Sequence, residues 1–125
     1  MADDDRRKRG LDAFEKVMGF RPPPIPGDPF LDATIDHLFA DVWARPGLST
    51  RERRIATLTL LMTLGLELHL RLHIGAAMKS GDLSDGEIDE LLLHVAHYGG
   101  WPGAASASQV IRQLRAERDK ARAGG

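Results

Sequence analysis

The sequence predicts an all-α protein, and three observations support this prediction. Apolar residues recur at helical spacing along most of the chain, Ser-x-x-Glu capping boxes begin at Ser49 and Ser84, and glycine or proline separates the apolar segments. A chain of 125 residues has the size of one domain. We therefore expect a single domain over residues 1–125, built as a bundle of about six helices, with flexible tails at 1–8 and 121–125.

The first two helical stretches are expected on either side of a proline-rich segment. Residues 21–29 (RPPPIPGDP) cannot form regular structure, because five prolines fix φ and remove amide donors. This segment separates an amphipathic stretch at 11–20 from one that begins near Asp28 and ends at 45–47. The apolar side chains at helical spacing in the second stretch are Phe30, Ile35, Leu38, Phe39 and Val42.

Capping residues place the starts of three further helices. The box Ser49–Glu52 predicts the start of a third helix, and the box Ser84–Glu87 predicts the start of another that runs to Gly99. The last helix is expected at about 102–121, because proline suits the first turn of a helix and Trp101-Pro102 follows the pair Gly99-Gly100.

Residues 66–74 (LELHLRLHI) alternate strictly between apolar and polar, which is also typical of a half-buried strand. Three arguments favour a helix. Ile74 is the only β-branched residue of the nine, Gly65-Leu66 is a poor hairpin turn, and an isolated hairpin is marginally stable. We therefore predict two helices over 55–81 that meet at Gly65.

The helical interpretation decides where four polar side chains point. At 100° per residue, His69 and His73 lie one turn apart on one side, and Glu67 and Arg71 lie on the opposite side. Leucines fill the sectors between them, so the helix is expected to be buried against several neighbours. Glu67 and Arg71 can pair with each other, whereas the two histidines have no obvious local partner.

Composition excludes several classes of function. Seventeen basic and eighteen acidic residues give a net charge of −1, which predicts no nucleic-acid partner and no attraction to an anionic membrane. The chain has no cysteine, which excludes disulfides, thiolate metal sites and thiol redox chemistry. No apolar run is long enough to span a membrane and the start lacks the apolar centre of a signal peptide, so we expect a cytoplasmic protein.

An ordered set of motifs resembles the carboxymuconolactone decarboxylase family. The motifs are WARPGLS (43–49), Arg53 with the apolar run to Gly65, ELHLRLHIGAAMKSG (67–81), the run from Glu87 to His94, and YGGWPGAA (98–105). The resemblance implies an all-helical, alkylhydroperoxidase-D-like fold, assembled as a trimer or hexamer. Members of the peroxidase branch carry a C-x-x-C pair where this chain has Leu66 and His69, so the absence of cysteine excludes thiol peroxidase activity.

The cysteine-free branch includes the decarboxylase that gives the family its name. That enzyme converts 4-carboxymuconolactone to the 3-oxoadipate enol-lactone without a metal or an organic cofactor. Arg71 and His73 match its R-L-H motif, and Arg53 matches the arginine that opens the preceding helix. The resemblance implies a cofactor-independent carbon–carbon lyase that acts on a small carboxylated lactone.

Such a reaction needs a group that holds the carboxylate, a donor for the developing oxyanion and a source of protons. We predict that His73 is the general acid or base and that His94 is a second acid or base or the oxyanion donor. Arg53 or Arg71 is expected to bind the carboxylate, because the planar guanidinium matches it. The other predicted substrate-binding residues are Glu67, His69, Tyr98 and Trp101.

Alternative interpretations of these residues stay open from the sequence alone. His73 is also compatible with a core histidine, Arg71 with a structural partner of Glu67, and Arg53 with a partner of Glu52 or of a neighbouring subunit. The His69-x-x-x-His73 spacing permits a metal-dependent hydrolase but lacks a third ligand, so we predict no metal.

Two further functions remain compatible with the sequence. These are a non-catalytic oligomeric protein that binds small molecules, and an isomerase or hydrolase of a related cyclic substrate. The excess of apolar helix faces in so small a subunit predicts a homo-oligomer in each case.

Overall fold

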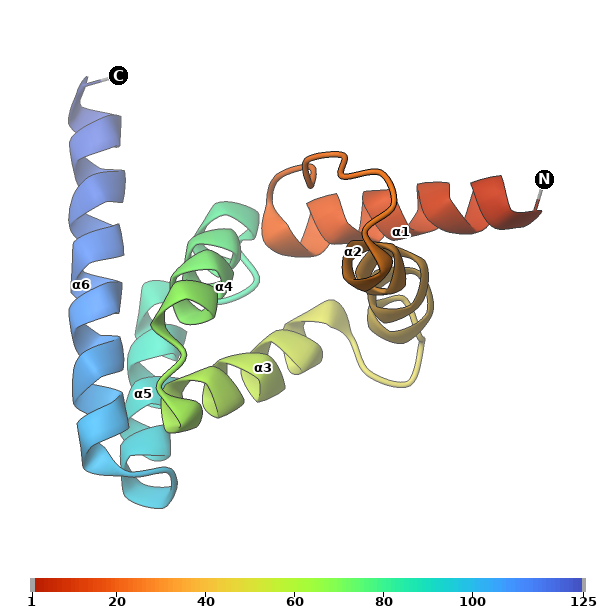
Figure 1. Cartoon of the computed structure of the whole chain (residues 1–125). Coiled ribbons are helices and arrows are strands. Elements are labelled where there is room, and N and C mark those ends of the chain that lie inside the picture. Colours follow the sequence, from red (N-terminus) through yellow and green to blue (C-terminus); the bar gives the residue numbers. More distant parts are fainter. Residues whose placement is uncertain (1, 125) are drawn as a thin grey trace. The chain divides into compact units, whose positions relative to one another are not determined.

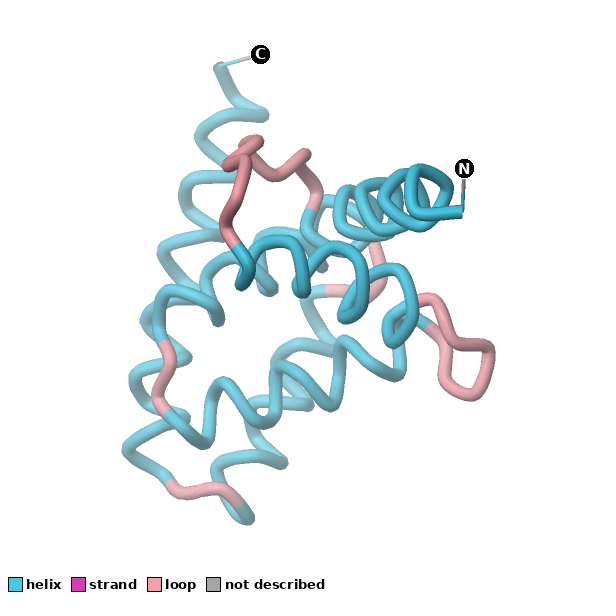
Figure 2. Tube along the Cα trace, turned by 45° about the vertical axis from the view of Figure 1, so that its right-hand side comes forward, coloured by secondary structure: helices cyan, strands magenta, loops and turns pink. Residues whose placement is uncertain are grey.

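The computed structural model describes residues 2–124, and in this range it consists of helices and connecting loops without a strand (Figures 1 and 2). The all-α prediction is therefore confirmed. The chain divides into two compact units, Met1–Arg53 and Arg54–Gly125. Met1 and Gly125 lie outside the described residues, and the prediction of one domain with flexible tails stays a prediction. No helix among the described residues is long and apolar enough to cross a membrane.

Unit 1 begins with α1 (Ala2–Met18), which starts nine residues before the stretch that the sequence predicted. Acidic residues at positions 3–5 suit the positive end of the helix dipole. Arg7 then donates to Asp36 at 2.6 Å and to Asp32 at 2.9 Å, so this mixed-charge segment is tied to the following helices. Local charge patterning does not reveal such cross-helix pairs, which is why the prediction began too late.

The helical stretch after the prolines is confirmed, with a change of helix type. Residues 21–27 contain no helix, and Asp28 caps α2 (Pro29–Ala33) by accepting from the amide of Phe30 at 3.0 Å. The chain continues as η1 (Thr34–Trp43), a wider π-type helix. Apolar spacing predicts a helical stretch but does not separate an α-helix from a π-helix.

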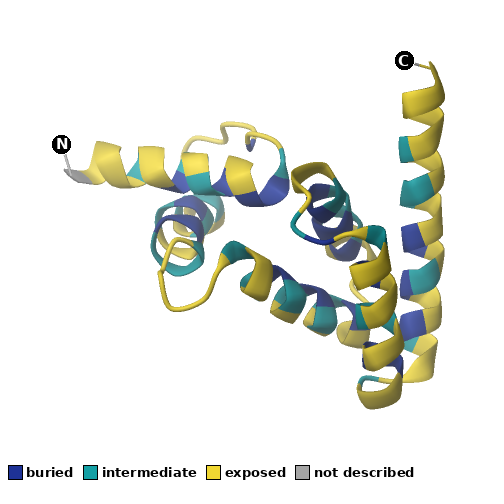
Figure 3. Cartoon of the chain, turned by 180° about the vertical axis from the view of Figure 1, so that it is seen from behind, coloured by how far each residue is buried: buried dark blue, intermediate teal, exposed yellow. Residues whose placement is uncertain are grey.

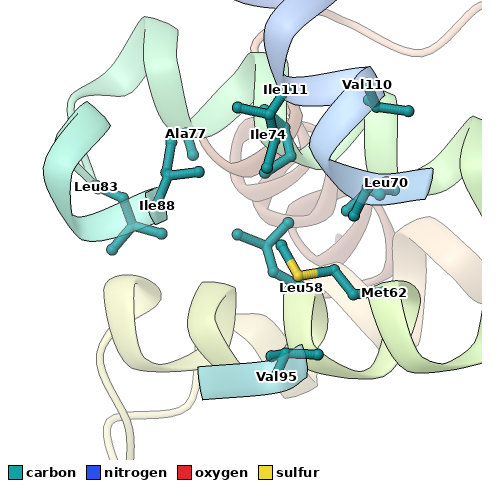
Figure 4. Close-up of a cluster of buried hydrophobic side chains, with 11 residues drawn as sticks. Leu58, Met62, Leu70, Ile74, Ala77, Leu83, Ile88, Val95, Val110 and Ile111 are labelled. Carbon is teal, nitrogen blue, oxygen red and sulfur yellow. The ribbon is translucent and has the colours of Figure 1, made fainter. Parts of the chain in front are cut away.

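Unit 2 holds most of α3 (Thr50–Leu64), together with α4 (Glu67–Ser80), α5 (Asp85–Tyr98) and α6 (Trp101–Gly124). The helical interpretation of residues 66–74 is confirmed, and Gly65 separates α3 from α4 with φ of +69°. Figure 4 shows the apolar core that these helices share. Its members are Leu58, Met62, Leu70, Ile74, Ala77, Leu83, Ile88, Val95, Ala107, Val110 and Ile111.

The predicted helix starts at the two capping boxes and at Pro102 are also confirmed. The Ser84 hydroxyl accepts from the Glu87 amide at 3.1 Å, and the Glu87 carboxylate accepts from the Ser84 amide at 2.9 Å. The same reciprocal bonds join Ser49 and Glu52. The α6 helix has Pro102 in its first turn and extends past the predicted end to Gly124, with its buried residues along one side (Figure 3).

The C-terminal end of α3 lies directly against the α5–α6 corner. A Cβ atom at Gly103 would lie 2.6 Å from the carbonyl oxygen of Met62, and one at Gly99 would overlap the hydroxyl of Thr63. Only glycine permits this approach of two backbones. The corner therefore holds the end of α3 and the start of α6 together in unit 2.

Candidate functional site

The candidate site is built around Arg54, a charged residue inside the core of unit 2. Arg54, Leu58 and Met62 recur at four-residue spacing on α3, and each is 0% exposed. Transfer of an unpaired guanidinium to an apolar interior is very costly, so a buried arginine needs partners.

Two of the partners of Arg54 come from other segments of unit 2. Nη1 of Arg54 lies 3.0 Å from Nδ1 of His73 on α4, and Nη2 donates to Oδ2 of Asp82 at 3.2 Å. Asp82 follows the C-terminal end of α4, and its own amide donates to the hydroxyl of Ser80. The result is a cluster of one cation, one anion and one imidazole, which we call the Arg54–His73–Asp82 cluster.

The contact with Arg54 fixes the tautomer of His73. Arginine has only donors, so Nδ1 of His73 must accept and the ring proton lies on Nε2. His73 is 8% exposed. Burial, together with the charges of Arg54 and His69, lowers the pKa of His73 to about 4. His73 is therefore a neutral ring at physiological pH, with a donor nitrogen and an occupied acceptor nitrogen.

Burial acts on Arg54 as well. It lowers the pKa of the Arg54 guanidinium, and the hydrogen bond and charge of Asp82 oppose this shift. Arginine nevertheless keeps its proton, because its ordinary pKa lies far above neutrality. The site therefore holds a permanent positive charge beside a neutral imidazole.

Other predicted residues of α4 lie at the surface of unit 2. His69 is exposed one turn before His73, and its charge contributes to the lowered pKa of that ring. The predicted pair of Glu67 and Arg71 is present, with 3.4 Å between the carboxylate and the guanidinium. Arg71 also donates to Gln113 of α6 at 2.7 Å, so these contacts favour the structural interpretation of Arg71.

Arg53 belongs to unit 1, where its guanidinium donates to the carbonyl of Arg45 at 3.3 Å. The next residue along α3, Arg54, is the arginine that contacts His73. Arg53 stays a predicted substrate-binding residue, whereas Arg54 and Asp82 were not predicted from the sequence. Arg54 is spaced four residues from Leu58 and eight from Met62, and this spacing could have shown that Arg54 lies on the buried face of α3. Asp82 lies in the loop after α4, where no periodic pattern predicts which side chains are buried.

His94 and its aromatic neighbours lie at the end of α5. The exposed ring of His94 stacks on Tyr98 with 5.0 Å between centroids, and the two line a surface depression with Glu90, Leu93 and His97. His73 is not among the residues of this depression. Among the described residues 2–124, no hydrogen bond or ring contact joins His94 to the Arg54–His73–Asp82 cluster.

Tyr98 and Trp101, which the sequence predicted to bind the substrate, have largely exposed side chains. Tyr98 is 85% exposed and Trp101 is 62% exposed, so neither is a core anchor of this chain. Trp101 lines a cavity of about 560 Å³ between α5 and α6, with Leu93 and Ala104 among its neighbours. Within residues 2–124, no three His, Asp or Glu side chains are grouped so that they would hold a metal ion.

Comparisons with known proteins agree with the motifs that the sequence carries. Residues 28–113 match the model of the carboxymuconolactone decarboxylase family. The chain is 31% identical over 129 residues to a 4-carboxymuconolactone decarboxylase from Acinetobacter baylyi, which covers 91% of this chain and 90% of that protein. It is 38% identical over 72 residues to a nitrosuccinic acid decarboxylase from Metarhizium robertsii, which covers 58% of this chain and 50% of that protein. The Arg54–His73–Asp82 cluster lies inside the matched region, and the chain belongs to the carboxymuconolactone decarboxylase family.

Proposed function

We propose that this protein is a decarboxylase that removes CO2 from a small carboxylated substrate resembling 4-carboxymuconolactone, without a metal or an organic cofactor. The observation that carries the substrate class is the similarity to the Acinetobacter baylyi decarboxylase along 91% of the chain. The second relative is also named as a decarboxylase, of nitrosuccinic acid. Both names describe acids in which an electron-accepting group, a conjugated lactone carbonyl or a nitro group, takes up the electron pair that CO2 leaves behind.

The reaction requires stabilisation of a developing oxyanion. When the bond to the carboxylate breaks, CO2 leaves and its bonding electrons move into the conjugated carbonyl, whose oxygen becomes negative. His73 is suited to donate a hydrogen bond to this oxygen, because its proton lies on Nε2 and its pKa is about 4. The assignment of His73 as the general acid or base stays a prediction.

A separate group must then protonate a carbon atom of the substrate. At a pKa of about 4, only about one His73 ring in a thousand is protonated at pH 7. We therefore assign carbon protonation to His69, which lies one turn from His73 and is exposed to solvent. Its imidazolium would transfer one proton to carbon and recover it from water. The assignment of His94 to the same step stays a prediction.

The positive charge of Arg54 favours an anionic substrate near His73. Arg54 is fully buried, however, so a direct bond to the substrate carboxylate is assigned to a more accessible arginine. Arg71 is partly exposed but is bound to Glu67 and Gln113, and Arg53 lies in unit 1. The choice between these two arginines stays a prediction.

The proposal is tested by incubating the purified chain with 4-carboxymuconolactone and, separately, with nitrosuccinic acid. We expect a change in ultraviolet absorbance that is matched by release of CO2 from at least one substrate. Release of CO2 separates a decarboxylase from an isomerase or a hydrolase, which would change the absorbance without producing CO2. Absence of CO2 from both substrates would refute the proposed substrate class.

We further propose that the protein assembles as a trimer or hexamer through an apolar surface on unit 2. Several large apolar side chains near the α3–α4 and α5–α6 connections and on α5 are exposed, and exposed apolar side chains that gather on one surface mark protein interfaces. These residues, which we call the apolar end of unit 2, are Leu60, Leu64, Leu66, Leu68, Leu93 and Trp101. Contact between α3 and the α5–α6 corner brings them to one end of the unit.

Light scattering at micromolar concentration tests this assembly. The wild-type chain is expected to have the mass of a trimer or hexamer, and the double variant Leu64→Glu/Leu68→Glu is expected to be smaller, because two charges would be buried at the interface. Phe30→Glu is the matched control, since Phe30 is 82% exposed on α2 in unit 1. A monomeric wild type would refute the assembly, and dissociation by Phe30→Glu would place the interface elsewhere.

A further inference from the structure

The fully buried charge of Arg54 needs a physical reason. An apolar residue of similar size at this position would avoid the desolvation cost, and buried ion pairs are often no more stabilising than the apolar side chains that replace them. Arg54 belongs to the same apolar stripe of α3 as Leu58 and Met62. The stability of the core therefore does not explain why an arginine occupies this position.

The geometry of the guanidinium links two side chains of unit 2. One terminal nitrogen of Arg54 contacts Nδ1 of His73 at 3.0 Å, and the other donates to Asp82 at 3.2 Å. Because the guanidinium is planar and rigid, the bond to Asp82 limits the directions in which the other nitrogen can donate. Asp82 thereby orients Arg54, and Arg54 orients the imidazole.

We propose that Arg54 is a positioning residue that holds the His73 ring with Nδ1 as acceptor and Nε2 as donor, and that Asp82 holds Arg54 in this arrangement. The contribution of Arg54 to catalysis rests on the proposed function, in which Nε2 of His73 donates a hydrogen bond to the oxyanion. Arg54 acts through His73 and does not itself touch the reacting atoms. The arrangement of the two side chains is testable without any substrate.

The contact also disfavours the protonated form of His73. An imidazolium would place an N–H group at Nδ1, so two donors and two positive charges would face each other across 3.0 Å. Arg54 from α3 and His69 from α4 are titratable groups whose charges lower the pKa of His73. Removal of the Arg54 charge is therefore expected to make the ring easier to protonate.

The experiment measures the titration of His73 by NMR in the full chain labelled with ¹⁵N-histidine, for the wild type, Arg54→Met and Asp82→Asn. In Arg54→Met, the proton affinity of His73 is expected to rise at least about tenfold, because the facing cation and its donor are gone. In Asp82→Asn, the proton affinity is expected to stay the same or to fall. The amide oxygen of asparagine can still accept from Arg54, so Arg54 keeps its position and its charge and loses only a negative neighbour. The ring of His37, exposed on η1 in unit 1, is the internal control.

The two variants separate positioning from general loosening of the core. Both change the cluster at its buried arginine, so a merely structural role of Arg54 predicts that both loosen the core and raise the proton affinity of His73 towards that of an exposed histidine. An equal rise in both variants, or no rise in folded Arg54→Met, would overturn the proposal. If Arg54→Met does not fold, Asp82→Asn decides alone, since a tenfold rise there contradicts the proposed arrangement.

The result of the His73 titration is independent of the result of the decarboxylase assay. If no CO2 is released from the two acids but His73 titrates as expected, the proposed function fails and the positioning by Arg54 stands. If CO2 is released but His73 titrates identically in all three proteins, the function stands and the positioning role fails. Each result therefore refers to only one of the two proposals.

Discussion

Replacement of His73 by glutamine is expected to lower kcat/KM for decarboxylation by about 100- to 1000-fold, the range for loss of one preorganised oxyanion donor. Nε2 of His73 carries the ring proton because Nδ1 accepts from Arg54. A glutamine amide is also a donor, but it is not held by Arg54 in the same direction. The loss is expected mainly in kcat, since the hydrogen bond strengthens as negative charge develops on the substrate oxygen.

The matched control for this prediction is His37→Gln. His37 is an exposed histidine of unit 1, and its replacement is expected to leave kcat/KM unchanged. His69→Gln is expected to lower kcat as well, through loss of the proton donor, and rescue of its activity by added imidazole would support that assignment. Circular dichroism establishes that each variant is folded before its activity is compared. Wild-type activity in folded His73→Gln would eliminate this residue from the mechanism.

The free energy of unfolding is expected to fall by about 3 kcal/mol between pH 7 and pH 4 through His73 alone. The pKa of His73 is about 4 in the folded protein, whereas an unfolded histidine has its ordinary value of about 6.5. Between these values the unfolded chain binds more protons than the folded chain. The stabilisation is therefore fully present above about pH 6.5 and is lost progressively as the pH falls to about 4.

Urea unfolding at a series of pH values tests this slope. Carboxylates with lowered pKa values, such as Asp36 beside Arg7 and Asp85 beside Arg118, also lose stabilisation in acid. Their loss begins nearer the ordinary carboxyl pKa of about 4, so it affects mainly the lower end of the range. His73→Gln is expected to flatten the slope between pH 6.5 and pH 4.5, and an unchanged slope in that variant would contradict the assignment to His73.

Much of the helical organisation was predictable because it depends on neighbours along the chain. The break at Gly65 requires a positive φ that glycine adopts readily, and the reciprocal bonds of Ser84 and Glu87 join residues only three positions apart. Strict alternation in residues 66–74 is also typical of a strand, but the helix was predicted correctly because leucine, glutamate and arginine favour helices. Each of these features is local, so its cause lies within one turn of chain.

The candidate site was less predictable, because its bonds join residues far apart in sequence. Arg54 and Asp82 are separated by 28 positions, and neither belongs to a sequence motif that predicts their contact. The start of α1 was predicted too late for the same reason, since Arg7 is tied to Asp36 across 29 positions. Arg54 follows Arg53 by one residue, which on a helix is a rotation of about 100°, so the two side chains point in different directions.

The sequence by itself determined that the protein is all-helical, that it lacks thiol chemistry and that it belongs to the carboxymuconolactone decarboxylase family. Helix propensity, capping and composition are properties of the chain before it folds, and they are sufficient for these conclusions. Only the tertiary structure decided that His73 is a neutral donor with its proton on Nε2. The protonation of an imidazole depends on its burial and on the charges that face it, and both exist only after α3 packs against α4.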